Sequence, residues 1–142
     1  MAQILVPIDG NGAQTQRALA EAIRIHWRED VPVYLLSVQS PVNGHVASYF
    51  GPAELERVQR ETGLEELGPA QALLDAAGVR YRLVVKVGRR AETIANTAQE
   101  LGCDRIVLGD AGEGGSAWFG SIAQQVRHLL QLRNATRLVS VI

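Results

Sequence analysis

The chain alternates short apolar runs with longer stretches in which apolar residues recur every three or four positions. Five runs are rich in Val, Ile and Leu, and several are nearly continuous, which is typical of parallel strands covered on both faces. They predict strands over residues 3–8, 31–38, 80–87, 105–109 and 137–142. Since a helical stretch separates each strand from the next, the pattern predicts an α/β fold. We expect a single open, doubly wound, parallel five-stranded sheet with helices on both faces.

Three of the four helical stretches have a regular apolar face. Residues from about 13 to 28 are expected to bury Leu19, Ile23 and Trp27, together with Ala18 and Ala22. The stretches ending near Leu101 and Leu130 follow the 3.6-residue period of an α-helix closely. Each of the three is therefore predicted to be an amphipathic helix that packs on the sheet.

The fourth helical stretch, residues 53–77, is less regular. Gly63 and the pair Gly68-Pro69 are expected to kink or break it, because proline interrupts the hydrogen-bond ladder of a helix. The preceding segment, residues 40–52, contains two prolines and two glycines and is predicted to be a loop.

Composition narrows the class of protein. The 142 residues carry a net charge of −1, which does not favour binding to nucleic acid or to an anionic membrane. No apolar run approaches the roughly 18 residues of a membrane span, and the N-terminus lacks the pattern of a signal peptide. The single cysteine, Cys103, has no second thiol for a disulfide or a metal site and is expected to be buried. We therefore expect a cytoplasmic protein with neither nucleic acid nor membrane as partner.

Candidate binding groups gather where the strands end. Ligands of doubly wound sheets bind outside the carboxyl ends of the strands, at the point where the strand order reverses. Asp9 follows the first strand, Val38 ends the second, and a loop with five glycines between residues 109 and 120 follows the fourth. A carboxylate acceptor, an apolar wall and free backbone N–H groups can together hold a nucleotide. Alternatively, Asp9 only caps the helix that follows it.

The motifs of other nucleotide-binding and phosphoacceptor proteins do not fit this sequence. The stretch GEGGSA (112–117) matches a dinucleotide fingerprint but follows the wrong strand, and no acidic residue comes after Glu113 to hold a ribose. A phosphate-binding P-loop is excluded because the only lysine, Lys86, lies inside a strand. Likewise, the third strand ends in Val87-Gly88 and lacks the phosphoacceptor aspartate of a response regulator.

The histidines do not suggest a catalytic triad. His26 and His128 are expected to be exposed or partly buried, whereas His45 lies in a loop that could fold over the pocket. Trp118 and Phe119 either pack on the sheet edge or fill the nucleotide's space. No catalytic residue and no metal ligand is predicted.

The segments ILVPIDG (4–10), VGRRAETIANTAQELGCDRIVLG (87–109), GSIAQQVRHLL (120–130) and RLVSVI (137–142) resemble the universal stress protein family. Because the resemblance covers essentially the whole chain, residues 1–142 are identified as one domain of this type. It implies a Rossmann-like or flavodoxin-like fold with strand order 3-2-1-4-5, and a homodimer. The family contains members that bind ATP and members that do not.

The ATP-binding members of this family have similar loops, written G-x-x-G, nine residues, then G-S or G-T. The glycine-rich loop of this chain departs from that pattern. Here Gly109 and Gly112 are followed by only seven residues before Gly120-Ser121. Asp110 and Glu113 lie in this loop without a Lys or Arg and should repel a triphosphate. We expect AMP or ADP to be tolerated better than ATP with Mg²⁺. The expected ligand-binding residues are Pro7, Ile8, Asp9, Val38, Gly109, Gly112, Gly120, Ser121 and Ile122.

Two hypotheses of function remain. The first is a stress protein that binds a ligand and an unknown protein partner, with at most weak ATPase activity. The second is an ATP-binding switch that hydrolyses ATP slowly.

An apolar strand at the edge of the sheet also predicts an assembly. In the implied order the last strand is an edge strand, and it carries no charge after Arg137. Exposed apolar edges favour pairing with another chain. We expect two copies to pair across a two-fold axis through Leu138, Val139, Val141 and Ile142.

Overall fold

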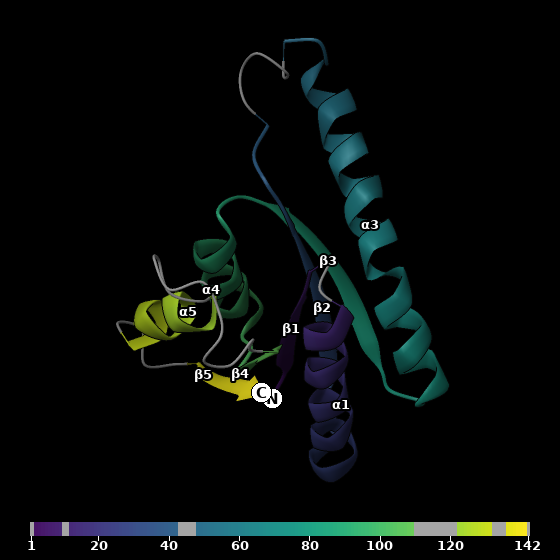
Figure 1. Cartoon of the computed structure of the whole chain (residues 1–142), viewed down its shortest axis with the longest axis vertical. Helices are drawn as coiled ribbons and strands as arrows, with labels where there is room; N and C mark the ends of the chain where they lie inside the picture. The colour runs from purple at the N-terminus through teal and green to yellow at the C-terminus, as the bar shows by residue number, and fades with distance from the viewer. Residues whose placement is uncertain (1, 10–11, 43–47, 110–121, 132–135, 142) are drawn as a thin grey trace.

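The computed structural model describes residues 2–9, 12–42, 48–109, 122–131 and 136–141. Strands and helices alternate along this part of the chain (Figure 1). The strands are β1 (Ile4–Ile8), β2 (Val33–Gln39), β3 (Tyr81–Val87), β4 (Arg105–Gly109) and β5 (Arg137–Val141). The helices are α1 (Gly12–Glu29), α3 (Pro52–Ala76), α4 (Arg90–Leu101) and α5 (Ile122–Gln131).

The five strands form one parallel sheet in the order β3-β2-β1-β4-β5. This confirms the predicted α/β fold and the strand order that the resemblance implied. The strand bounds agree with the sequence pattern to within two residues, since continuous apolar runs mark strands that are covered on both faces.

Helices α1 and α3 cover one face of the sheet, and α4 and α5 cover the other (Figure 1). Because side chains alternate along a strand, β1 sends Ile4, Val6 and Ile8 into the α1/α3 core and Leu5 into the α4/α5 core. All five of its residues are buried. Cys103 is buried in the α4/α5 core, as predicted.

The buried face of α1 differs from the prediction. Trp27 is 65% exposed, whereas Ile25 and His26 are buried. A helix turns by about 100° per residue, so Trp27 lies about 80° around the axis from Leu19, on the side away from the buried Ala22. His26 lies only about 20° from Leu19, and its Nδ1 is 2.8 Å from the backbone oxygen of Val31. The expectation of an exposed or partly buried His26 was therefore wrong.

Helix α3 is continuous through Gly63 and Gly68-Pro69, so the break that the sequence allowed there is absent, and Pro69 lies inside the helix. Proline removes one hydrogen bond, and Gly68 lacks the Cβ that would clash with the proline ring. Gly63 serves packing, because a Cβ there would lie 2.5 Å from Cγ1 of Val85 on β3. Gly63 therefore allows α3 to pack closely on the sheet.

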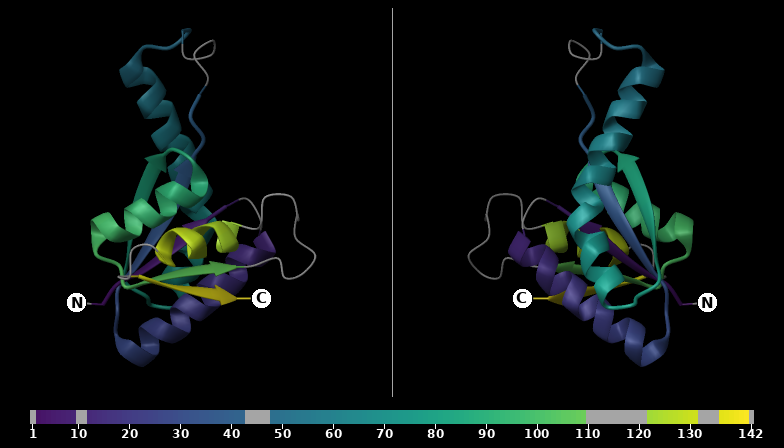
Figure 2. Two further views of the ribbon diagram at one scale, coloured as in Figure 1. Left: turned by 90° about the vertical axis from the view of Figure 1, so that its left-hand side faces the viewer. Right: turned by 90° about the vertical axis from the view of Figure 1, so that its right-hand side faces the viewer.

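The first part of α3 extends beyond the sheet (Figures 1 and 2). Its buried residues begin only at Gly63, eleven positions after the helix starts at Pro52. Tyr49, Phe50 and Val58 are exposed at this end. No helix in the described part of the chain is long and apolar enough to cross a membrane.

Candidate functional site

The candidate site lies where β1 and β4 separate at the carboxyl edge of the sheet. The ladder between them covers only Ile4 with Arg105 and Leu5 with Ile106, although β1 stays paired with β2 up to Ile8. Pro7 follows that ladder and has no N–H to donate, so the missing hydrogen bond accords with the separation. The strand order reverses at this point, which is where doubly wound sheets bind ligands.

Asp9 follows β1 at this separation and contacts two helices. Its backbone oxygen lies 3.4 Å and its Oδ1 3.5 Å from the hydroxyl of Thr15 in the first turns of α1. Its Oδ2 lies 3.2 Å from Nη2 of Arg90, the first residue of α4. The contact with Thr15 suits a role in starting α1, while the pair with Arg90 links the same carboxylate to the other face of the sheet.

Alternation along β2 places Val38 on the same face of the sheet as Arg90. Val38 packs against the α4/α5 core. Its neighbour Ser37 points to the opposite face, where its hydroxyl donates to Glu66 of α3 at 3.0 Å. Val38 therefore faces the α4/α5 side near the carboxyl edge, and its role as an apolar wall for a ligand stays a prediction.

The other predicted residues of β1 reach the site less directly. Ile8 is 3% exposed and belongs to the α1/α3 core, so its side chain points away from Val38. Pro7 is buried in the strand. These two residues can contribute backbone atoms and the shape of the edge.

Gly109 ends β4 beside the start of α1. A Cβ at this position would overlap the backbone carbonyl of Gln14. The glycine therefore allows α1 to approach the end of β4 closely, which gives it a packing role independent of any ligand. Ile122 begins α5 and packs against the α4/α5 core.

Three predicted ligand residues, Gly112, Gly120 and Ser121, lie outside the described residues. Asp110, Glu113, Trp118, Phe119 and His45 lie outside them as well, so the predictions about the acidic loop stay predictions. The described residues contain no group of three His, Cys, Asp or Glu side chains that could hold a metal ion.

Arg90 is the site residue that the sequence analysis missed. The signal was present, since Arg89 and Arg90 follow the third strand at the same edge of the sheet. The helices α1, α4 and α5 also begin at this edge, and helix N-termini favour negatively charged ligands. The described groups can thus accept a hydrogen bond through Asp9 and donate to an anion through Arg90.

Comparison with known proteins identifies a family that matches most of the chain. The model of the universal stress protein family matches residues 1–131. A comparison with curated proteins finds no match.

Solved structures with a similar fold include three proteins described with an adenine nucleotide. A universal stress protein in complex with cAMP has a TM-score of 0.77 and 20% identity, covering 99% of this chain and 97% of its own. The protein from Archaeoglobus fulgidus in complex with dAMP has a TM-score of 0.67 and 21% identity, covering 100% and 98%. A protein from Arabidopsis thaliana with AMP bound has a TM-score of 0.64 and 13% identity, covering 100% and 93%.

Proposed function

The chain belongs to the universal stress protein family, and from this premise we propose that it binds an adenine mononucleotide at the carboxyl edge of its sheet. Binding rather than turnover would be its mode of action, with the ligand altering contacts with a protein partner. A cytoplasmic stress response is the setting that we propose for it.

The separation of β1 from β4 beside Asp9 is the observation that carries the proposal. It combines an open position in the sheet, a carboxylate that accepts hydrogen bonds, and the apolar side chain of Val38 on the same face. A nucleotide has hydroxyl and amino groups to donate to Asp9 and a base to contact Val38. The three similar structures described with cAMP, dAMP and AMP support this ligand class.

The length and charge of the glycine-rich loop favour a mononucleotide over ATP. Only seven residues separate Gly112 from Gly120, and Asp110 and Glu113 add negative charge where a triphosphate would need compensation. A single phosphate needs fewer contacts and brings less charge than a triphosphate. Mg²⁺ enters the proposal only if ATP itself binds.

Purified protein tests the proposal directly. The absorbance ratio and mass spectrometry after denaturation should reveal co-purified AMP or ADP, and calorimetry should show binding of added AMP. Asp9→Asn should weaken AMP about 10-fold or more, since hydrogen bonds to a charged group are worth about 1.5–3 kcal/mol. Asp75→Asn is the matched control, because Asp75 contacts Tyr81 at the far end of α3.

Failure to bind AMP or ADP at millimolar concentration would contradict the proposal. Tight ATP binding with slow release of ADP would instead establish the nucleotide switch. Equal affinities for AMP in the wild type and in Asp9→Asn would show that Asp9 serves only to start α1.

A further inference from the structure

Arg90 forms an ion pair with the carboxylate of Asp9, on which the proposed function depends. Its Nη2 lies 3.2 Å from Oδ2 of Asp9, and both side chains are about one-third exposed, at 30% for Arg90 and 31% for Asp9. Partly exposed ion pairs contribute little net stability. A ligand that offers the guanidinium a better anion can therefore separate the pair.

The position of Arg90 in α4 makes such an exchange favourable. Arg90 is the first residue of the helix, where the helix dipole disfavours a positive charge. Glu92 in the same turn and the Asp9 carboxylate offset this effect. A phosphate near the N-terminus of α4 would interact favourably both with the helix dipole and with Arg90.

The glycine-rich loop offers no cationic side chain to a phosphate, so a cation would have to come from another part of the chain. No Lys or Arg lies between residues 109 and 121, and Asp110 and Glu113 are both acidic. Guanidinium groups bind phosphate oxygens in a bidentate manner, whereas an uncharged sugar or base gains little from them.

We propose that Arg90 determines specificity for phosphorylated ligands, by exchanging its partner Asp9 for the phosphate of a nucleotide. The exchange removes Arg90 from Oδ2 of Asp9, so that this oxygen can accept a hydrogen bond from the sugar or the base. Arg90 thus opposes neutral nucleosides and favours their phosphates. This inference rests on the proposed nucleotide site and gives a role to Arg90, a residue that the proposed function does not use.

Calorimetry at low ionic strength with adenosine, AMP and inorganic pyrophosphate tests the role. Arg90→Gln should weaken AMP about 10-fold or more, because a hydrogen bond to a charged group is lost. Adenosine should bind the variant as tightly as the wild type or up to about 5-fold more tightly, because the competing ion pair is absent. Arg89→Gln is the matched control, since it removes the same charge from an exposed neighbouring residue, and it should preserve the preference for AMP.

The outcomes separate this inference from the proposed function. Equal weakening of adenosine and AMP, or unchanged AMP affinity in Arg90→Gln, would overturn the role of Arg90 while leaving nucleotide binding intact. If the wild type binds neither AMP nor adenosine but binds pyrophosphate through Arg90, the nucleotide proposal fails and the phosphate role stands. If pyrophosphate also fails to bind, both are overturned.

Discussion

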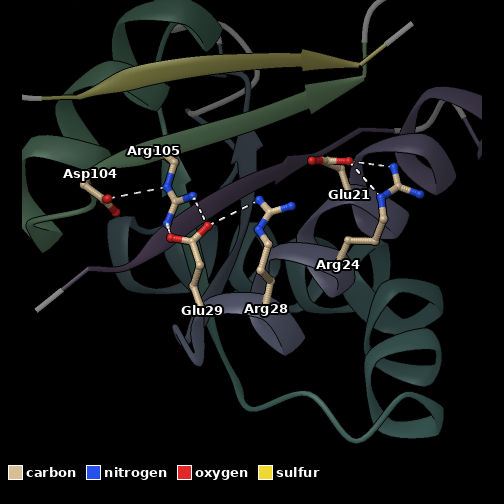
Figure 3. Close-up of polar contacts among 6 residues, drawn as sticks. All are labelled: Glu21, Arg24, Arg28, Glu29, Asp104 and Arg105. Carbon is tan, nitrogen blue, oxygen red and sulfur yellow. Dashed lines mark hydrogen bonds and ion pairs between the residues drawn. The ribbon is translucent and has the colours of Figure 1, made fainter.

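Arg105 is the first residue of β4 and lies at the amino-terminal end of the strands, opposite the candidate site. Its charged guanidinium lies in the protein interior, with the side chain only 7% exposed (Figure 3). Its Nη1 and Nη2 donate to the two carboxylate oxygens of Glu29 at 2.8 and 2.9 Å. Nε lies 3.4 Å from Oδ2 of Asp104, which brings the charges together without hydrogen-bond geometry. These contacts tie the end of α1 to the start of β4.

The ion pair between Glu29 and Arg105 predicts that the folded protein loses stability at acidic pH. Hydrogen bonds from Arg105 lower the pKa of Glu29 below its ordinary value of 4.5. The folded state therefore favours the ionised carboxylate, so its contribution to stability is present above pH 4.5 and is lost as the pH falls through the lower, folded-state pKa. We expect Glu29→Gln to lower the melting temperature at neutral pH and to flatten its decline below pH 4.5.

Thermal unfolding between pH 7 and pH 3 checks this prediction. Glu61→Gln is a suitable control, since the pair of Glu61 with Arg57 lies on the exposed surface of α3. The same acid dependence in Glu29→Gln as in the wild type would show that other carboxylates control acid unfolding.

Burial also governs the chemistry of Cys103. Desolvation and the neighbouring Asp104 raise the pKa of its thiol to about 12. Because the thiolate is the reactive form, Cys103 is an inert packing residue in the folded protein.

Helix α3 shows how a glycine can serve packing inside a helix, since Gly63 lies against Val85 of β3. Its buried residues Gly63, Leu67, Ala70 and Leu74 lie three or four positions apart and face the sheet. Ser37 and Gln39 on β2 both donate to Oε2 of Glu66 at 3.0 Å, which adds polar contacts to the same interface. These contacts hold the helix through Pro69, where the backbone lacks a donor.

We predict that Gly63→Ala destabilises the protein even though alanine favours helices. Contact with Val85 adds an overpacking cost of about 1–3 kcal/mol. The gain in helix propensity is only about 1 kcal/mol, so the net loss should reach up to about 2 kcal/mol. Urea unfolding measures the difference.

The Val85→Ala background supplies the matched comparison. It removes the two Cγ atoms that would lie 2.5 and 2.9 Å from the new Cβ. In the Val85→Ala background, Gly63→Ala should be neutral or should stabilise the protein by up to about 1 kcal/mol. The change in the free energy of unfolding would then no longer be a loss. Equal destabilisation in both backgrounds would rule out the contact with Val85 as the cause.

The whole sheet has β3 and β5 as its two edges. Val139 and Val141 pack partly against the α1/α3 core, while Leu138 packs against the α4/α5 core. Ile142 lies outside the described residues. An edge strand with little charge favours pairing with a second chain, so we propose a homodimer in which two copies of β5 meet across a two-fold axis.

Sedimentation of the wild type should therefore give a species of twice the 15.4 kDa chain mass. Val139→Pro removes a backbone donor from β5 and should shift the protein toward monomer or insoluble material. Val139→Thr keeps the donor and a similar shape, so it should remain dimeric. Circular dichroism identifies any variant that fails to fold. A wild-type monomer at high micromolar concentration would contradict the proposed assembly.

The sequence by itself determined the order of the elements and the class of fold. Strand β4 spans the predicted residues 105–109, and Leu130, near which the predicted apolar stretch of α5 ends, is buried. Such features depend on periodicity within a few neighbouring residues, which any single segment displays. The placement of Asp9 and Val38 at the carboxyl edge followed from parallel strands having a common direction.

Only the tertiary structure decided which helix face is buried and which distant residues meet. Asp9 meets Arg90 across 81 positions of sequence, and Gly63 meets Val85 across 22. The apolar pattern of α1 predicted that Trp27 is buried. In the structure Trp27 is exposed and His26 is buried. Local patterns leave the rotation and depth of a docked helix undetermined, and these contacts depend on shifts of a few ångströms between elements that pack together only in the folded chain.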